Sequence, residues 1–85
     1  MKTFAYTIKD ELGIHARPAG ALAKEAVKYE SVIQIVKGDK AVILTHLLKL
    51  MALGIKKGDT VSIVIEGTDE EVAITGMQTF FENNL

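Results

Sequence analysis

Two apolar periodicities follow one another along this chain, and their order constrains the fold more than any other feature of the sequence. Alternation of apolar and polar residues predicts a strand, whereas apolar residues at i, i+3, i+4 and i+7 predict an amphipathic helix. Strands are predicted over residues 4–8, 32–36, 41–44 and 60–66, and helices over 16–27, over 45–53 and in a last segment that contains Ala73, Ile74, Met77, Phe80 and Phe81. The order βαββαβα implies an α+β fold, an open-faced β-sandwich with helices on one face of a mostly antiparallel four-stranded sheet. The strand order stays open, because a ferredoxin-like arrangement also reads βαββαβ.

Turn residues mark the boundaries of these elements. Gly38 and Asp39 between the second and third strands predict a tight hairpin, and Gly54 is expected to end the second helix. Residues 68–71 match a capping box, with acids in the first turn of the last helix. Gly76 lies inside that helix and is expected to cost about 1 kcal/mol relative to alanine.

Composition excludes several classes of protein. With 85 residues, 48% hydrophobic and 25% charged, the chain is expected to form one globular domain, residues 1–85. The absence of cysteine removes disulfides, thiolate metal sites and thiol catalysis. A net charge of −1 offers no basic face for nucleic acid, and no segment approaches the roughly 18 apolar residues of a membrane span. Because the first residues alternate as a strand rather than forming a secretion signal, a cytoplasmic location is expected.

The segment 13–20 concentrates the rarest polar residues of the chain. It contains the only arginine, Arg17, one of the two histidines, His15, and the only proline, Pro18. The helical spacing begins directly afterwards, so His15 stands at a predicted helix N-terminus. There the leading N–H groups have no intrahelical partner and the helix dipole is positive, which favours an anion. Proline is tolerated in such a first turn because it gives up only an N–H that would be unpaired.

A phosphate group would suit this turn. The backbone N–H groups of Ala16 and Arg17 are free to bind it, and the guanidinium of Arg17 offers a planar fork of donors. An uncharged imidazole has a lone pair available for attack, so His15 could become phosphorylated, and the added negative charge would then lie against the helix dipole. Two simpler interpretations stay open: His15 could cap the helix with a ring nitrogen, and Arg17 could be an ordinary solvated residue.

Three segments of the chain resemble the HPr family, the histidine-containing phosphocarrier proteins of the phosphoenolpyruvate-dependent sugar phosphotransferase system. Residues 13–19, Gly-Ile-His-Ala-Arg-Pro-Ala, resemble the family's phosphorylation motif. Residues 47–54, Leu-Leu-Lys-Leu-Met-Ala-Leu-Gly, resemble its second helix, and residues 66–71 resemble the start of its last helix. The resemblance therefore runs nearly from end to end of the chain.

The resemblance implies a carrier rather than an enzyme. His15 would accept a phosphoryl group on Nδ1 from phosphorylated Enzyme I and pass it to the IIA domain of a sugar permease, with Arg17 stabilising the transferred group. The implied fold has the antiparallel strand order 1-4-2-3, and neither a metal nor a cofactor is implied. Two alternatives remain: a paralogue of the regulatory, nitrogen-related branch of the phosphotransferase system, or a regulatory α+β module that binds an anion without covalent chemistry.

The helix predicted over residues 45–53 carries more apolar residues than one buried stripe requires. Leu50 and Leu53 can serve the core, which leaves Leu47, Leu48 and Met51 on a neighbouring arc. An exposed apolar arc usually marks a partner surface, although a fully buried helix is the alternative. The resemblance implies partner contacts at Leu47, Leu48, Lys49 and Met51, together with Gly20 and Arg17. We expect a monomer that forms small interfaces, under about 1,200 Å², with these partners.

His46 departs from one branch of the family, the Gram-positive branch, which carries a regulatory serine at the start of this helix. A histidine is no substrate for a serine kinase, so the resemblance implies that this switch is absent or acts at a neighbour such as Thr45. Thr45 is also expected to be the better N-cap. A second phosphoryl site at His46 is disfavoured because no arginine accompanies it, and we expect a solvated residue there.

Overall fold

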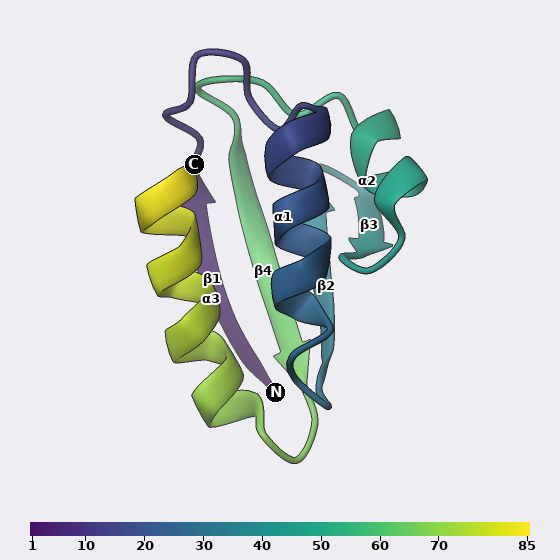
Figure 1. Ribbon diagram of the computed structural model, residues 1–85, viewed down its shortest axis with the longest axis vertical. Coiled ribbons are helices and arrows are strands. Elements are labelled where there is room, and N and C mark those ends of the chain that lie inside the picture. The colour runs from purple at the N-terminus through teal and green to yellow at the C-terminus, as the bar shows by residue number, and fades with distance from the viewer.

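The four strands form one antiparallel sheet in the order β1-β4-β2-β3. The computed structural model describes residues 1–85 (Figure 1). Its elements, in chain order, are β1 (Lys2–Thr7), α1 (Ala16–Ala26), β2 (Val32–Lys37), β3 (Lys40–Ile43), α2 (Leu47–Ala52), β4 (Thr60–Glu66) and α3 (Glu70–Asn84). The predicted order of elements is confirmed. So is the strand order 1-4-2-3, which came from the family resemblance and not from the periodicity.

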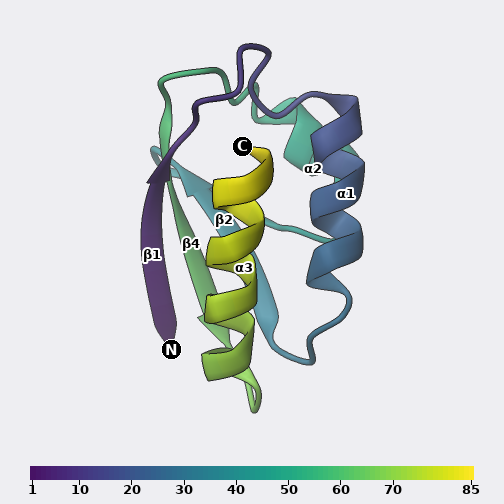
Figure 2. The same ribbon diagram turned by 60° about the vertical axis from the view of Figure 1, so that its left-hand side comes forward.

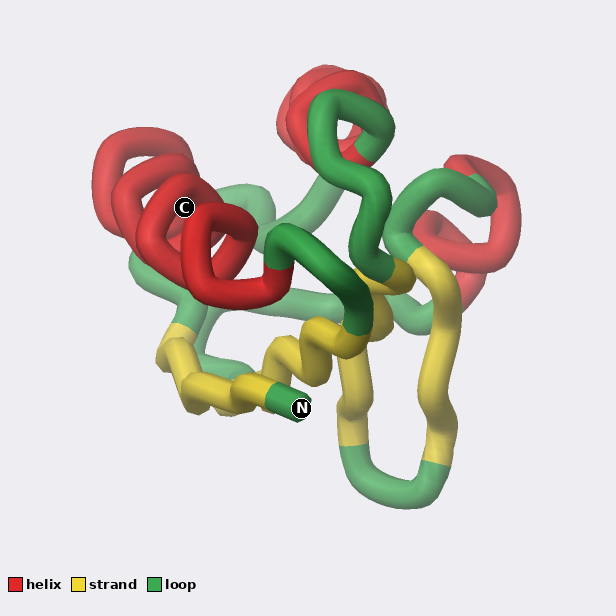
Figure 3. Tube along the Cα trace, turned by 90° about the horizontal axis from the view of Figure 1, so that it is seen from below, coloured by secondary structure: helices red, strands yellow, loops and turns green.

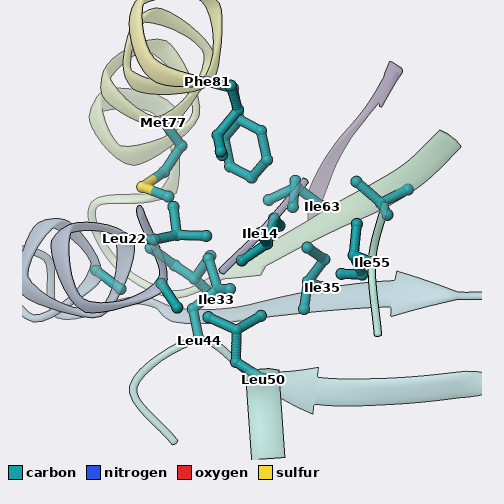
Figure 4. Packing of buried hydrophobic residues seen from close by; sticks show 14 of the residues in the cluster. Ile14, Leu22, Ile33, Ile35, Leu44, Leu50, Ile55, Ile63, Met77 and Phe81 are labelled. Carbon is teal, nitrogen blue, oxygen red and sulfur yellow. The ribbon is translucent and has the colours of Figure 1, made fainter. Parts of the chain in front are cut away.

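All three helices lie on the same side of the sheet (Figures 2 and 3). Strand alternation explains why, since Val61, Ile63 and Ile65 of β4 are buried whereas Thr60, Ser62 and Glu66 are exposed. Apolar residues from the three helices close over the buried face, including Leu22, Leu50 and Met77 (Figure 4). Phe81 of α3 packs edge-on against Phe4 and Tyr6 of β1, with ring centroids 5.7 and 5.4 Å apart. The open-faced sandwich is therefore confirmed.

The β2–β3 hairpin has the predicted two-residue turn. Lys37 pairs with Lys40 across it, so Gly38 and Asp39 are its central residues. Gly38 has a φ of 62° and Asp39 has a negative φ, which matches the glycine-first type II′ turn.

The second helix is shorter than predicted. It begins at Leu47, and its N-cap is His46, so Thr45 lies outside the helix and is not the cap. The amide of Leu50 donates to the carbonyl of His46 at 2.9 Å, which closes the first turn, and no side chain caps it. Local periodicity could not locate this start, because Thr45 and His46 are polar residues that fit either side of a helix boundary.

The predicted capping box at residues 68–71 is wrong in detail. The N-cap of α3 is Asp69, without a side-chain cap, and it is Glu70 whose carboxylate accepts a hydrogen bond from the amide of Gly67 at 3.1 Å. The Asp69 carboxylate instead accepts hydrogen bonds from the amides of Glu30, at 2.8 Å, and Ser31, at 2.9 Å. Asp69 therefore ties the segment before β2 to the start of α3, a tertiary role that outweighs the local one.

Gly76 has a packing role in α3. A Cβ built on it would overlap the hydroxyl of Tyr29 and lie 2.9 Å from the ring carbon Cζ. The same hydroxyl donates a hydrogen bond to Glu25 of α1 at 3.1 Å. Glycine at this position thus lets Tyr29, in the turn after α1, approach α3 closely, which explains a residue that helix propensity alone counts as unfavourable.

Candidate functional site

Gly13 fixes the backbone that leads into His15. Its φ is 68°, and a Cβ on it would collide with the carbonyl oxygen of Ile55 and lie 2.7 Å from Cα of Lys56. Only glycine combines this left-handed conformation with so close an approach. Immediately afterwards the amide of Ile14 donates to the Ile55 carbonyl at 3.1 Å, and the Ile14 side chain is buried. The loop before α1 is therefore anchored to the segment between α2 and β4 directly beside His15.

His15 is the N-cap residue of α1, with an extended backbone (φ −96°, ψ −173°). Its carbonyl accepts the first intrahelical hydrogen bond, from the amide of Ala19 at 2.9 Å. The imidazole makes no capping hydrogen bond, so the interpretation of His15 as a side-chain cap is wrong. The ring is 36% exposed and accessible to a reactant.

The N-terminus of α1 lacks the features that usually neutralise a helix end. Ala16 and Arg17 occupy the first two helical positions, where an amide has no acceptor four residues earlier, and Pro18 has no amide proton. No acidic residue lies in this first turn, whereas α3 begins with Glu70 and Glu71. The positive end of α1 is thus left for an external anion.

Six residues line a surface depression of ≈ 270 Å³ at this point: Asp10, His15, Arg17, Pro18, Ala21 and Asn84. His15 and Arg17 are brought together as predicted, whereas Asp10 and Asn84 were not predicted. The carboxylate of Asp10 accepts a hydrogen bond from the amide of Leu12 at 2.9 Å and lies 3.9 Å from Nε2 of His15. Asp10 resembles an ordinary turn residue in sequence, and Asn84 comes from the far end of the chain, so no local signal could have identified either one.

The apolar arc on α2 is exposed, as its spacing predicts. Leu50 is 1% exposed, whereas Leu47 and Met51 are each 38% exposed and Leu48 is 81% exposed. Lys49 is also exposed. The alternative of a fully buried α2 is therefore wrong.

Gly20 and α2 belong to neighbouring parts of the molecule. α1 and α2 pack against each other and lie side by side in Figure 1. A Cβ on Gly20 would meet no atom within 4 Å, so packing inside this chain does not require glycine there. The turn at His15, Gly20 and the arc on α2 are thus presented by two helices in direct contact.

His46 is exposed, as predicted, and makes no side-chain hydrogen bond at the start of α2. It does not line the depression at His15, which contains no residue of α2. No group of three or more histidine, cysteine or acidic side chains that could hold a metal ion occurs in the molecule. None of its helices has the length and apolar character needed to cross a bilayer.

The fold and this site define a small α+β protein whose first helix begins without a side-chain cap or an acidic residue, beside an accessible histidine. Residues 2–83 match the family model described as the PTS HPr component phosphorylation site. The chain belongs to the HPr family, the phosphocarrier proteins of the phosphotransferase system.

Individual relatives agree with this assignment. The chain is 42% identical over 89 residues to the phosphocarrier protein HPr of Mycoplasma genitalium, covering 99% of this chain and 97% of the relative. A solved histidine-containing phosphocarrier protein of Mycoplasma superposes with a TM-score of 0.92 at 36% identity, covering 96% of this chain and 93% of that one. Because the relatives are phosphocarrier proteins, the prediction of a carrier rather than an enzyme is confirmed.

The similar structures include dimers. An HPr dimer from Thermoanaerobacter tengcongensis has a TM-score of 0.77 and 36% identity, covering 98% of this chain and 95% of that one. The monomer expected for the present chain stays a prediction.

Proposed function

We propose that residues 1–85 form one phosphocarrier domain in which Nδ1 of His15 accepts a phosphoryl group from phosphorylated Enzyme I and passes it to the IIA domain of a sugar permease in the cytoplasm. The observation that carries the proposal is the position of His15: an accessible imidazole at a helix N-terminus that has neither a side-chain cap nor an acidic residue.

In the proposed step the lone pair on Nδ1 attacks the phosphorus of the donor phosphohistidine, and the phosphorus–nitrogen bond of the donor breaks. This requires the imidazole tautomer with its proton on Nε2. The carboxylate of Asp10, 3.9 Å from Nε2, favours a proton on that nitrogen and supports the assignment to Nδ1. The reverse sequence on a IIA domain returns His15 to the same neutral form.

The transferred group carries about −1.5 to −2 charges once it is bound. The free amides of Ala16 and Arg17, the positive end of α1 and the guanidinium of Arg17 would each stabilise it. Phosphoryl transfer depends mainly on positioning and charge stabilisation, so a preformed anion site supplies much of what the reaction needs.

The docking surface in this proposal comprises Gly20, Leu47, Leu48, Lys49 and Met51. Its exposed leucines and methionine offer the adaptable apolar contacts that suit two different partners. A shuttle must leave each partner quickly, which is why a small interface is expected.

The proposal is tested by incubating the protein with Enzyme I, Mg²⁺ and phosphoenolpyruvate and following ³¹P NMR. We expect an acid-labile phosphohistidine signal that His15→Ala abolishes. His46→Ala is the matched control, because it removes the only other histidine and should leave the signal intact. Absence of the signal from the wild type, or phosphorylation only by the Enzyme I of the nitrogen-related branch, would contradict the proposal.

A further inference from the structure

Lys37, the last residue of β2, binds both ends of the segment 54–59, which supports the turn at His15. Its Nζ lies 3.1 Å from Oδ2 of Asp59 and donates to the carbonyl of Gly54 at 3.1 Å and, more weakly, to that of Leu53 at 3.5 Å. Leu53 and Gly54 end α2, and carbonyls at a helix C-terminus carry partial negative charge, so an ammonium group is favoured there.

The segment 54–59 is the common support of α2 and the His15 turn. It follows α2 from Gly54 onward. The carbonyl of Ile55 accepts a hydrogen bond from the amide of Ile14, the residue before His15. The segment ends at Asp59, whose carbonyl accepts a hydrogen bond at 2.9 Å from the amide of Ile8, the residue directly after β1. Figures 1 and 2 both show it running beside the loop before α1.

Asp59 forms two hydrogen bonds within this segment, both with the backbone of Lys56. Its carboxylate accepts a hydrogen bond from the amide of Lys56 at 2.8 Å, and its amide donates to the carbonyl of Lys56 at 3.0 Å. The Lys56 amide and then the Lys37 ammonium hold the pKa of the Asp59 carboxyl below its usual range. Asp59 therefore stays ionised and available to Lys37 at neutral pH.

We propose that Lys37 is a positioning residue for phosphoryl transfer, which with Asp59 fixes the docking helix α2 relative to the His15 turn. The role rests on the proposed function, since it concerns the position of the docking surface relative to the acceptor histidine. Lys37 does not line the depression at His15 and touches no reacting atom. Its loss would let α2 and the segment 54–59 shift, so a partner seated on α2 would reach His15 less often in the productive geometry.

The test compares Lys37→Met with Lys37→Arg and with Lys40→Met, a control on the same hairpin whose side chain forms no ion pair. Transfer from phosphorylated Enzyme I is measured against carrier concentration. Lys37→Met is expected to lower kcat about tenfold at unchanged KM, because docking on α2 is retained while productive positioning is lost; tenfold is the equivalent of one charge-assisted hydrogen bond. Lys37→Arg and Lys40→Met should both stay within about twofold of the wild type.

A second arm uses phosphoramidate, a small donor that needs no docking surface. Attack by the His15 nitrogen on its phosphorus releases ammonia, and we expect equal labelling rates for the wild type and Lys37→Met. An unchanged kcat in Lys37→Met, or phosphoramidate labelling slowed as much as enzymatic transfer, would overturn the positioning role while the proposed function stands. A wild type that accepts nothing from Enzyme I would overturn the proposed function and this inference with it.

Discussion

Replacement of Gly13 by alanine probes the contact that places His15. The substitution adds one methyl group, at a backbone φ of 68°, against the backbone of Ile55 and Lys56. Those atoms cannot rotate away as a side chain could, so either Gly13 leaves its conformation or the segment 54–59 moves. Both responses strain the hydrogen bond from the Ile14 amide to the Ile55 carbonyl.

Three costs add up in this variant. An L-residue in the left-handed region costs about 1–2 kcal/mol. Overpacking against a fixed neighbour costs about 1–3 kcal/mol, and loss of the Ile14 hydrogen bond costs about 1 kcal/mol. The free energy of unfolding should therefore fall by about 3–6 kcal/mol, a large part of the 5–15 kcal/mol typical of a small domain.

Gly38→Ala is the matched control, because Gly38 has a φ of 62° but no atom within 4 Å of its Cβ position. It should cost only the backbone penalty of about 1–2 kcal/mol. Urea unfolding followed by circular dichroism measures both variants. The close approach accounts for an expected difference of about 2–4 kcal/mol, and equal losses for Gly13→Ala and Gly38→Ala would refute the argument.

Three further predictions test other contacts. Gly76→Ala should destabilise the protein by roughly 1–2 kcal/mol despite the better helix propensity of alanine, because its methyl group meets the Tyr29 hydroxyl. Most of that cost should vanish when Tyr29→Phe is also present. A Gly76→Ala variant more stable than the wild type would contradict the packing role. Leu48→Ser should leave stability within about 0.5 kcal/mol, since this side chain is 81% exposed, yet slow transfer from Enzyme I about tenfold, and normal transfer would exclude Leu48 from the docking surface. The Ser31 hydroxyl is the main cause that lowers the pKa of Asp69. The stability from this carboxylate is therefore present above its unfolded pKa of about 3.9 and lost as pH falls through the lower folded pKa. In urea unfolding measured at a series of pH values, Asp69→Asn should reduce the fall in stability on the acid side. An unchanged acid dependence in this variant would argue against the role of Asp69.

Local pattern was enough for the elements but not for their arrangement. Alternating residues in β1 and β4 face the core as the sequence predicts, because period-two alternation is itself a consequence of one buried face. Strand order depends on which strands meet in space, and only the resemblance supplied it. His15 was identifiable because rare residues cluster at a predicted helix start, and that start is set by local chemistry.

The roles of residues that contact distant segments could not be predicted from the sequence. Asp69 has the local signature of a helix cap, yet its carboxylate binds the amides of Glu30 and Ser31. Helix propensity alone counts Gly76 as destabilising, and only the contact with Tyr29 explains why glycine is needed there. In both cases a tertiary contact between distant segments decides the role, and periodicity carries no information about such contacts.

The same distinction applies to the connection between the proposed acceptor and the proposed docking surface. His15 and the arc on α2 are each visible in sequence, but their relative position depends on the segment 54–59, which shows only as a turn. Gly13 approaches the backbone of this segment so closely that no side chain would fit, and the Lys37 ammonium binds Gly54 and Asp59 at its two ends. A carrier that presents one histidine to different partners needs a fixed distance between its docking surface and that histidine. In the proposed carrier that distance would be set by the backbone contact at Gly13 and by Lys37, neither of which lines the depression at His15.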